Sequence, residues 1–385
     1  MKIAIPKERR AFEKRVAAVP ETVKKYRALG YDVAVEAGAG TEASYPDEQY
    51  AAAGATIAAD AGLALRDADI VLRVQRPMTA AEGLNETGFL KPGCVLIGML
   101  NPYAARADLD LYARGQITAM SMELVPRITR AQSMDVLSSQ SNLAGYRAVL
   151  DATEQFGRAF PMMMTAAGTI PPARVMVMGA GVAGLQAIAT ARRLGAVVSA
   201  TDVRPVAREQ VESLGATFVM VESEETRQAE TSGGYAKEMS EDYRQRQAAL
   251  IAETIKKQDV VICTALIPGR AAPRLVTEEM IRSMRPGSVI VDLAVEQGGN
   301  CALSEAGKVV DAFGVKIVGY RNMPSRIAVD ASALYARNLL NYMTLVTAKT
   351  GGQLAINMDD EIIRAVTLTR DGAVIHPQFQ QTGAA

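Results

Sequence analysis

The sequence predicts an α/β protein of two domains, each built on a parallel sheet, with the first domain discontinuous. Long helices are expected to join the domains, with a cleft between them. Three observations lead to this prediction. The 385 residues are enough for two domains. Short apolar runs alternate with helical patterns along the chain, as in parallel sheets. A late helical pattern, residues 325–343, can return the chain to the first domain. We place the domains at 1–137 with 326–385, and at 138–325.

The N-terminal region of the chain opens with an apolar strand at residues 2–5, followed by a charged loop. A helix then starts with Pro20 in its first turn and stops at Gly30, which are favoured residues at those positions. Four further strands are predicted at residues 31–36, 69–74, 94–99 and 117–122. This spacing predicts an α/β domain, although the domain has no glycine fingerprint of its own.

A helix starting at Ser138 and running through Phe156 is expected to connect the domains. The second domain then follows the same alternation of strands and helices. Its predicted strands are 174–178, 197–201, 217–221, 260–264 and 288–293, and its predicted helices are 185–194 and 207–214.

A glycine-rich turn, Gly179-Ala180-Gly181-Val182-Ala183-Gly184, follows the strand 174–178 and opens a helix. The glycines suit a tight turn, a close backbone approach to a pyrophosphate, and close helix–strand packing. The helix N-terminus directs free N–H groups toward phosphates. Asp202 lies 18 residues beyond Gly184, at the end of the second strand, where a carboxylate can accept from a ribose hydroxyl. Together these features predict a Rossmann-like dinucleotide-binding domain.

Asp202 also indicates which dinucleotide binds. A carboxylate at this position hydrogen-bonds a free 2′-hydroxyl and repels a 2′-phosphate, so NAD(H) is favoured over NADP(H). Arg204 could neutralise a phosphate. We instead expect it to be solvated or to lie near the adenine.

Two loops follow predicted strands of this domain, at 265–269 and 294–300. Because ligands bind at the carboxyl ends of parallel strands, we expect both loops to flank the nicotinamide. The charged segment 222–247 contains Gly233, Gly234 and Tyr235. It is interpreted either as a lid with Tyr235 at its tip or as a surface loop. The predicted cofactor-binding residues are Gly179, Ala180, Gly181, Val182, Gly184, Asp202, Val203, Arg204, Gly234, Tyr235, Ala265 and Leu266.

The composition excludes several classes of protein. Forty-two basic residues balance 42 acidic ones, which leaves no electrostatic footprint for nucleic acid. We find no apolar run of the length that a membrane helix needs, and no signal-peptide pattern at the N-terminus. The three cysteines are far apart and show no metal-ligand spacing. We therefore expect a cytoplasmic chain without metal or disulfides.

The chain has one histidine, His376, beside a proline near the C-terminus. Dehydrogenases of alcohols or amino acids commonly need a general acid or base, often histidine. The position of His376 favours a structural or surface role.

Several phrases together resemble a known family. They are Ile5-Pro-Lys-Glu, Val74-Gln-Arg-Pro-Met, the stretch 126–147, Gly233-Gly-Tyr-Ala-Lys-Glu-Met and Ala265-Leu-Ile-Pro-Gly. They resemble the NAD(H)-binding component of proton-translocating nicotinamide nucleotide transhydrogenase, over nearly the whole chain. That family shares its two-domain fold with alanine dehydrogenase.

The resemblance implies direct hydride transfer between NAD(H) on this chain and NADP(H) on a separate subunit, with a membrane-spanning subunit coupling it to proton movement. It implies a homodimer located on the inner face of the cell membrane through its partners. The chain resembles the version in which this component is a separate subunit. The implied catalytic residues are Arg127 and Ser138 at the nicotinamide carboxamide, Asp135 paired with Arg127, and Gln132 reaching toward the partner's nucleotide. Tyr235 would tip the loop that folds over NAD(H).

Two alternatives remain open. An alanine-dehydrogenase-like enzyme would have the same fold, and its family resembles this chain less at the substrate. It has a lysine where this chain has Gln75, a histidine near Leu100 or Asn101, and an aspartate at Glu296. The other alternative is a non-catalytic NAD(H) sensor, which would not need the polar set at 127–138. In a further interpretation, Arg127 and Asp135 form only a domain-linking ion pair.

Overall fold

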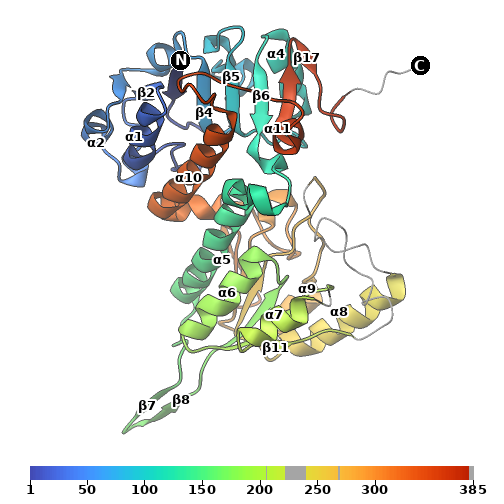
Figure 1. The fold of residues 1–385 in the computed structure, drawn as a ribbon. Helices are drawn as coiled ribbons and strands as arrows, with labels where there is room; N and C mark the ends of the chain where they lie inside the picture. The colour runs from blue at the N-terminus through green and yellow to red at the C-terminus, as the bar shows by residue number, and fades with distance from the viewer. Residues whose placement is uncertain (205, 222–239, 268, 381–385) are drawn as a thin grey trace. The chain divides into compact units, whose positions relative to one another are not determined.

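The computed structural model describes residues 1–204, 206–221, 240–267 and 269–380 (Figure 1). These residues form two compact units. Unit 1 contains Met1–Gln140 and the described residues from Ser325 onward, and unit 2 contains Ser141–Pro324. The boundaries placed from the sequence differ from these by three residues at the first break and by one at the second.

Unit 1 is built on an eight-stranded sheet in the order β17-β16-β6-β5-β4-β1-β2-β3. The six strands from β6 to β3 are parallel, whereas β16 and β17 add to the β6 edge in antiparallel pairs. The strands are β1 (Lys2–Ile5), β2 (Asp32–Glu36), β3 (Thr56–Ala58), β4 (Ile70–Gln75), β5 (Val95–Met99), β6 (Thr118–Ser121), β16 (Thr367–Arg370) and β17 (Ala373–Val374).

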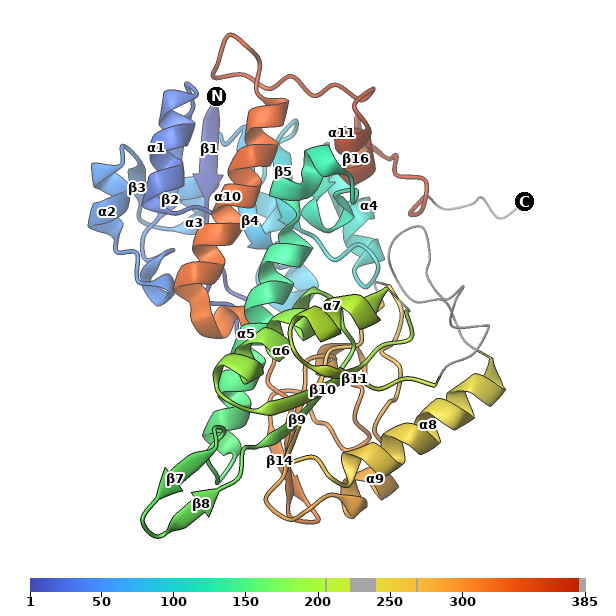
Figure 2. The same cartoon turned by 60° about the horizontal axis from the view of Figure 1, so that its bottom comes forward.

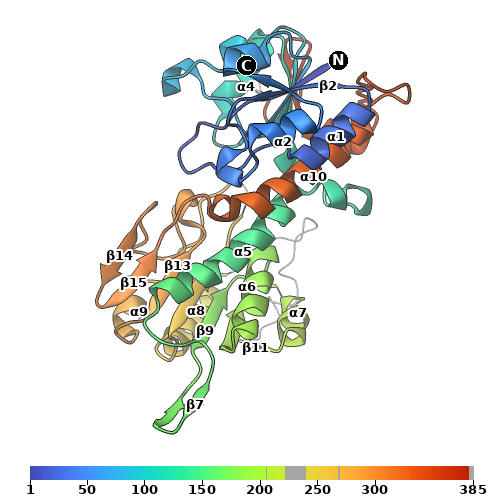
Figure 3. The same cartoon turned by 90° about the vertical axis from the view of Figure 1, so that its left-hand side faces the viewer.

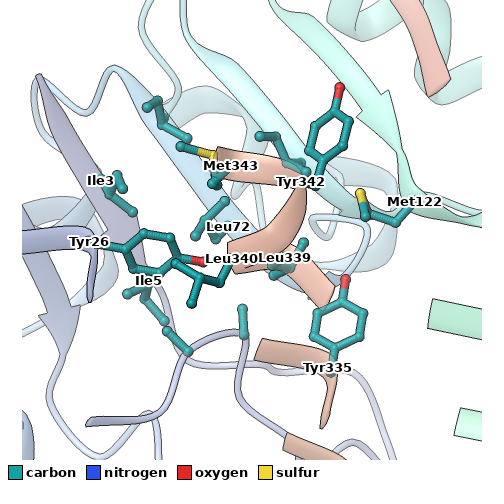
Figure 4. Close-up of a cluster of buried hydrophobic side chains, with 14 of the residues drawn as sticks. Ile3, Ile5, Tyr26, Leu72, Met122, Tyr335, Leu339, Leu340, Tyr342 and Met343 are labelled. Atoms are coloured by element: carbon teal, nitrogen blue, oxygen red, sulfur yellow. The ribbon is translucent and has the colours of Figure 1, made fainter. Parts of the chain in front are cut away.

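The helices of unit 1 are α1 (Pro20–Ala28), α2 (Asp47–Ala52), α3 (Ala61–Leu65), α4 (Arg106–Arg114), α10 (Ala328–Val346) and α11 (Glu361–Val366). Helix α10 packs on the sheet through Tyr335, Leu339 and Met343, which meet Ile3 and Ile5 of β1 in one buried cluster (Figure 4). Burying such side chains contributes about 1.5–3 kcal/mol each. The late helix predicted from the sequence therefore belongs to the core of unit 1.

Unit 2 contains a seven-stranded sheet in the order β11-β10-β9-β12-β13-β15-β14, parallel except for β14 (Figures 2 and 3). Its strands are β9 (Arg174–Met178), β10 (Val197–Thr201), β11 (Thr217–Phe218), β12 (Val260–Cys263), β13 (Val289–Asp292), β14 (Val309–Ala312) and β15 (Val315–Val318). Its helices include α6 (Val182–Arg193), α7 (Ala207–Ser213), α8 (Glu241–Ile255) and α9 (Glu278–Ser283), and α5 (Val136–Gln155) supplies residues from Ser141 onward.

Strand β9 shows why this sheet needs helices on both faces. Val175 and Val177 are buried in a cluster with residues of α5, α6 and α7. Met176 and Met178 are buried in a second cluster with residues of α8 and α9. Alternate side chains of a strand point to opposite faces, so a strand that is apolar throughout must be covered on both sides.

The structure confirms the predicted α/β class with parallel-rich sheets. Strands β9 and β10 have the predicted bounds, and α6 starts three residues before the predicted helix. The sequence did not predict the antiparallel hairpin of β7 (Met163–Thr165) and β8 (Gly168–Ile170), nor the antiparallel strands β14, β16 and β17.

Candidate dinucleotide-binding site

The predicted fingerprint forms the turn between β9 and α6. Gly179 has φ +100°, a backbone conformation that favours glycine, and its N–H donates to Thr201 O at 2.8 Å. Gly181 is the N-cap of α6, and no side chain caps the helix there. The first N–H groups of this 12-residue helix therefore have no side-chain acceptor from the N-cap and can donate to a ligand.

The three fingerprint glycines meet different surroundings. A Cβ at Gly184 would lie 1.8 Å from Gly179 O, so this glycine permits α6 to pack on the turn. A Cβ at Gly179 would lie 2.8 Å from Thr264 Oγ1 on the neighbouring strand end. A Cβ at Gly181 would meet nothing within 4 Å among the described residues. Gly181 thus faces open space, as a glycine does where a pyrophosphate approaches the backbone.

Asp202 lies directly after β10 and contacts the fingerprint turn. Its Oδ2 accepts from the Ala180 N–H at 2.7 Å. Arg204 also binds this carboxylate, through Nε to Oδ1 at 2.9 Å and Nη2 to Oδ2 at 2.8 Å. The expectation that Arg204 is solvated or lies near the adenine is wrong for this structure. A guanidinium two residues from a carboxylate gains a charge-assisted pair that solvent does not match.

Val203 and Gln247 fix the chain that follows Asp202. Val203 is half-buried and packs with Tyr243 of α8. Gln247, also on α8 and buried, donates through Nε2 to Thr201 Oγ1 at 2.7 Å and accepts from Val221 N–H at 3.0 Å. Sequence analysis did not identify Gln247, because nothing in its local pattern indicates a contact 46 residues away.

The loop after β12 is held by Asn300. Its Oδ1 accepts from the Ala265 N–H at 3.1 Å and its Nδ2 donates to Ala265 O at 2.9 Å. Asn300 is fully buried, and its own N–H donates to Asp292 Oδ1 at 3.2 Å, at the end of β13. Ala265 and the half-buried Leu266 therefore lie beside Gly179, next to the fingerprint turn. Sequence analysis placed Asn300 in a loop but gave it no role.

The predicted catalytic residues lie in unit 1, on the 3-10 helix η5 (Thr129–Met134) and at its two ends. Arg127 and Gln132 are exposed. Asp135 accepts from the Ser138 N–H at 2.9 Å and from the Ser138 hydroxyl at 2.6 Å. The structure thus brings Asp135 and Ser138 together at the start of α5. The pairing of Asp135 with Arg127 stays a prediction.

This polar segment is fixed to unit 1 from two sides. Asn338 and Asn341 of α10 donate to Ser133 O at 2.8 and 3.0 Å. Arg130 binds Asp360, the N-cap of α11, through two hydrogen bonds of 2.7 and 3.0 Å. The segment therefore presents its exposed side chains from an ordered backbone.

Gly234 and Tyr235, with most of the predicted lid, lie outside the described residues. The part of the charged segment that is described, from Ser240, begins helix α8 with the Ser240 hydroxyl accepting from Tyr243 N–H at 3.2 Å. The lid interpretation stays a prediction.

The positions at which alanine dehydrogenases were expected to differ have other partners here. Gln75 donates to Glu13 Oε2 at 2.6 Å, and Leu100 is fully buried. Asn101 donates its N–H to Glu123 at 2.9 Å. Glu296 accepts from Arg321 at 3.2 Å. None of these contacts, as described, supplies a histidine or lysine.

His376 is half-buried and its Nε2 lies 3.1 Å from Ala365 O. Burial lowers the pKa of this imidazole, and the hydrogen bond to Ala365 opposes that shift. Its ring packs near Phe379, at 5.0 Å between centroids. This environment indicates a structural residue of unit 1.

Among the described residues, no helix is both long and apolar enough to cross a membrane. The same residues contain no group of three or more metal-ligating side chains. The three cysteines are free and buried. Burial raises the pKa of Cys94 to about 12 and that of Cys301 to about 11.

The chain matches two family models, the N-terminal domain of alanine dehydrogenase/PNT at residues 4–144 and the C-terminal domain at 148–377. It is 59% identical to the first of the polypeptides that form the NAD(P) transhydrogenase alpha subunit of Rhodospirillum rubrum, over 100% of both chains. A crystal structure of transhydrogenase from Sinorhizobium meliloti superposes with a TM-score of 0.88 at 53% identity, covering 97% of this chain and 100% of that one. A structure of L-alanine dehydrogenase gives 0.82 at 26% identity, covering 99% and 98%. The chain therefore belongs to the alanine dehydrogenase/PNT family of oxidoreductases, within its group of NAD(P) transhydrogenase alpha subunits.

Proposed function

We propose that this chain is the NAD(H)-binding subunit of a proton-translocating transhydrogenase. Hydride passes directly between NAD(H) on this chain and NADP(H) on a partner subunit. A membrane-spanning partner couples that transfer to proton movement. The observation that carries the proposal is the turn 179–184, where Asp202 binds the Ala180 amide in a chain 59% identical to a transhydrogenase alpha-subunit polypeptide.

The residues of unit 2 fit a dinucleotide. The open space at Gly181 and the first N–H groups of α6 suit a pyrophosphate. Asp202 supplies carboxylate oxygens at the end of β10, where a ribose would lie. Gly179, Ala180, Val182, Gly184, Val203, Ala265 and Leu266 complete the proposed set, with Gly234 and Tyr235 proposed from the resemblance.

The chemistry needs no acid or base on this chain. The nicotinamide supplies and accepts the hydride, and exchange between two nicotinamides releases no substrate proton. The protein must orient the rings and exclude water. A polar segment without histidine suits that task. We assign Arg127 and Ser138 to the carboxamide, Asp135 to the positioning of Arg127, and Gln132 to the partner's nucleotide.

The chain is proposed to act as a homodimer, held at the inner face of the cell membrane by its partner subunits. The β7–β8 hairpin supports self-association. Met162, Met163, Met164 and Ile170 are 59%, 45%, 76% and 40% exposed. A protein that leaves a cluster of large apolar side chains on an extended arm commonly covers it with a partner. A hairpin from a second copy is the simplest such partner, because cyclic dimers are the commonest oligomers.

The test combines the purified chain with an NADP(H)-binding transhydrogenase subunit and measures hydride exchange between NADH and an NADP⁺ analogue. Exchange only when both proteins are present supports the proposal. Oxidation of alanine or reduction of pyruvate by the chain alone would establish the alanine dehydrogenase alternative instead. NADH binding without exchange under any partner would favour a sensor. Sedimentation of the chain alone tests the homodimer.

A further inference from the structure

Helix α6, which opens the proposed pyrophosphate site, lies beside α5 (Figures 1 and 3). Gly145 is at this contact. A Cβ on Gly145 would lie 2.0 Å from Ala183 O, 2.8 Å from Ala183 C and 3.0 Å from Ala183 Cα. All three atoms are backbone atoms in the first turn of α6. No side-chain rotation can relieve such a contact.

A glycine at this position is not explained by the helix itself. Gly145 lies inside the 20-residue helix α5, where glycine is the poorest residue after proline. It does not have a positive φ, so its backbone conformation accepts any residue. The close approach of the Ala183 carbonyl is therefore what requires glycine here.

The first turn of α6 is confined on a second side. The residue after Ala183 is Gly184, whose Cβ would lie 1.8 Å from Gly179 O. Two consecutive residues of α6 thus contact backbone on two sides, α5 and the β9–α6 turn, without an intervening side chain. A second link between the helices is the hydrogen bond from Asn142 Nδ2 to Gln186 Oε1, at 3.3 Å.

We propose that Gly145 is a positioning residue for the dinucleotide pyrophosphate, a fourth glycine that α5 contributes to the fingerprint of Gly179, Gly181 and Gly184. It acts through the backbone of Ala183 by fixing where the N–H groups at the start of α6 point. The inference rests on the proposed function, because it assumes that α6 binds a pyrophosphate.

An alanine at position 145 must move one of the two helices. Heavy atoms rarely approach a Cβ closer than 3.0 Å, so the 2.0 Å separation requires a shift of about 1 Å. Helix α5 is anchored by Ala148 and Val149, both fully buried. The start of α6 is freer, because Val182 is 39% exposed. The shift therefore falls on the N–H groups that would bind phosphate, whose hydrogen bonds depend on distance and direction.

The experiment compares Gly145→Ala with Gly157→Ala. Gly157 is exposed, and a Cβ there meets nothing within 4 Å among the described residues, so it controls for the substitution itself. Dissociation constants are measured for NADH by fluorescence and for adenosine, which has no phosphate, by ligand-observed NMR. Circular dichroism checks folding.

We expect Gly145→Ala to weaken NADH binding at least about tenfold, as misplacement by about 1 Å commonly does, while adenosine binding stays within about twofold. Gly157→Ala should match the unsubstituted protein for both ligands. NADH binding unchanged in Gly145→Ala would overturn the inference. A parallel loss of NADH and adenosine would also overturn it, since it would show a general loss of the fold.

If Gly145→Ala does not fold, Asn142→Ala decides. This exposed side chain tethers the same two helices, and its removal should weaken NADH binding by about two- to fivefold with adenosine unchanged. An unchanged NADH affinity in Asn142→Ala would then overturn the inference. Failure of the proposed function has a different signature, because the unsubstituted chain itself would bind neither NADH nor ADP.

Discussion

Arg204 binds both carboxylate oxygens of Asp202, two residues before it in the chain. The pair is mostly buried, with 17% and 9% of the two side chains exposed. It shares Asp202 with the Ala180 N–H of the fingerprint turn. A ribose that uses Asp202 must therefore compete with a guanidinium for acceptor oxygens that are already bonded. The positive charge of Arg204 also reduces the repulsion that Asp202 exerts on a 2′-phosphate.

Removing either member of this pair should change cofactor preference in opposite directions. We expect Arg204→Ala to increase the preference for NADH over NADPH several-fold, because the carboxylate is left uncompensated. We expect Asp202→Ala to weaken NADH binding by about tenfold or more, the loss of a charge-assisted hydrogen bond, and to strengthen NADPH binding through the released Arg204. Titrations of both nucleotides against each variant measure these ratios. A shift of both variants toward NADPH would contradict the assignment.

Gly181 and Gly184 should respond differently to alanine. In Gly181→Ala the new methyl group meets open space and φ is −77°, so the free energy of unfolding should change by less than about 0.5 kcal/mol. The same methyl group would occupy the pyrophosphate path and weaken NADH binding at least about tenfold. In Gly184→Ala the clash with Gly179 O should cost about 1–3 kcal/mol of stability.

Urea unfolding and NADH titration separate the two effects. Gly157→Ala is a control that should leave both quantities unchanged. Equal losses of stability in Gly181→Ala and Gly184→Ala would show that Gly181 has a packing role and does not face a ligand.

His376→Gln should leave hydride exchange in the reconstituted complex within about twofold of its normal rate, because no proton transfer to carbon is needed. The substitution keeps a side chain that can bond the Ala365 carbonyl, so the fold should persist. Rates are compared from pH 6 to 8, since burial holds the pKa of His376 below its usual value of 6.5. A rate that falls at least about tenfold would assign His376 to the reaction.

The local features of the fold could be predicted from the sequence, and the long-range ones could not. Strand β9 and its fingerprint turn are contiguous, and the strand's apolar residues are buried on both faces, so pattern and structure agree. The β7–β8 hairpin was missed because all six of its strand residues are exposed and show no alternation of polar and apolar side chains.

The site shows the same division. The sequence indicated Asp202 through its distance from the glycines, a spacing that the βαβ unit imposes. It could not show that Arg204 turns back onto Asp202, because a flexible side chain chooses its partner from three-dimensional geometry. Nor could it show Asn300 on Ala265, a contact between residues 35 positions apart that depends on how β12 and β13 are aligned.

The buried pair of Glu13 and Arg15 in unit 1 gives a stability prediction with a defined pH dependence. Arg15 donates to both oxygens of Glu13, at 2.8 and 2.7 Å, and Gln75 donates to one of them. Burial by itself raises the pKa of Glu13. The Arg15 charge and these hydrogen bonds outweigh burial and lower the pKa from 4.5 to about 2. A carboxylate whose folded pKa is depressed contributes stability above its unfolded pKa, and that contribution is lost as the pH falls toward the folded value.

Glu13→Gln should therefore lower the free energy of unfolding at pH 7 by about 3 kcal/mol, because it leaves the buried Arg15 without a counter-charge. The difference from the unsubstituted protein should shrink as the pH falls from 4.5 toward 2, where Glu13 itself becomes protonated. The matched control is Glu21→Gln, an exposed glutamate paired with Lys25, which should cost less than about 1 kcal/mol. Urea unfolding at several pH values measures both variants. A Glu13→Gln deficit that stays constant between pH 7 and 3 would show that packing, and not the ion pair, causes the loss.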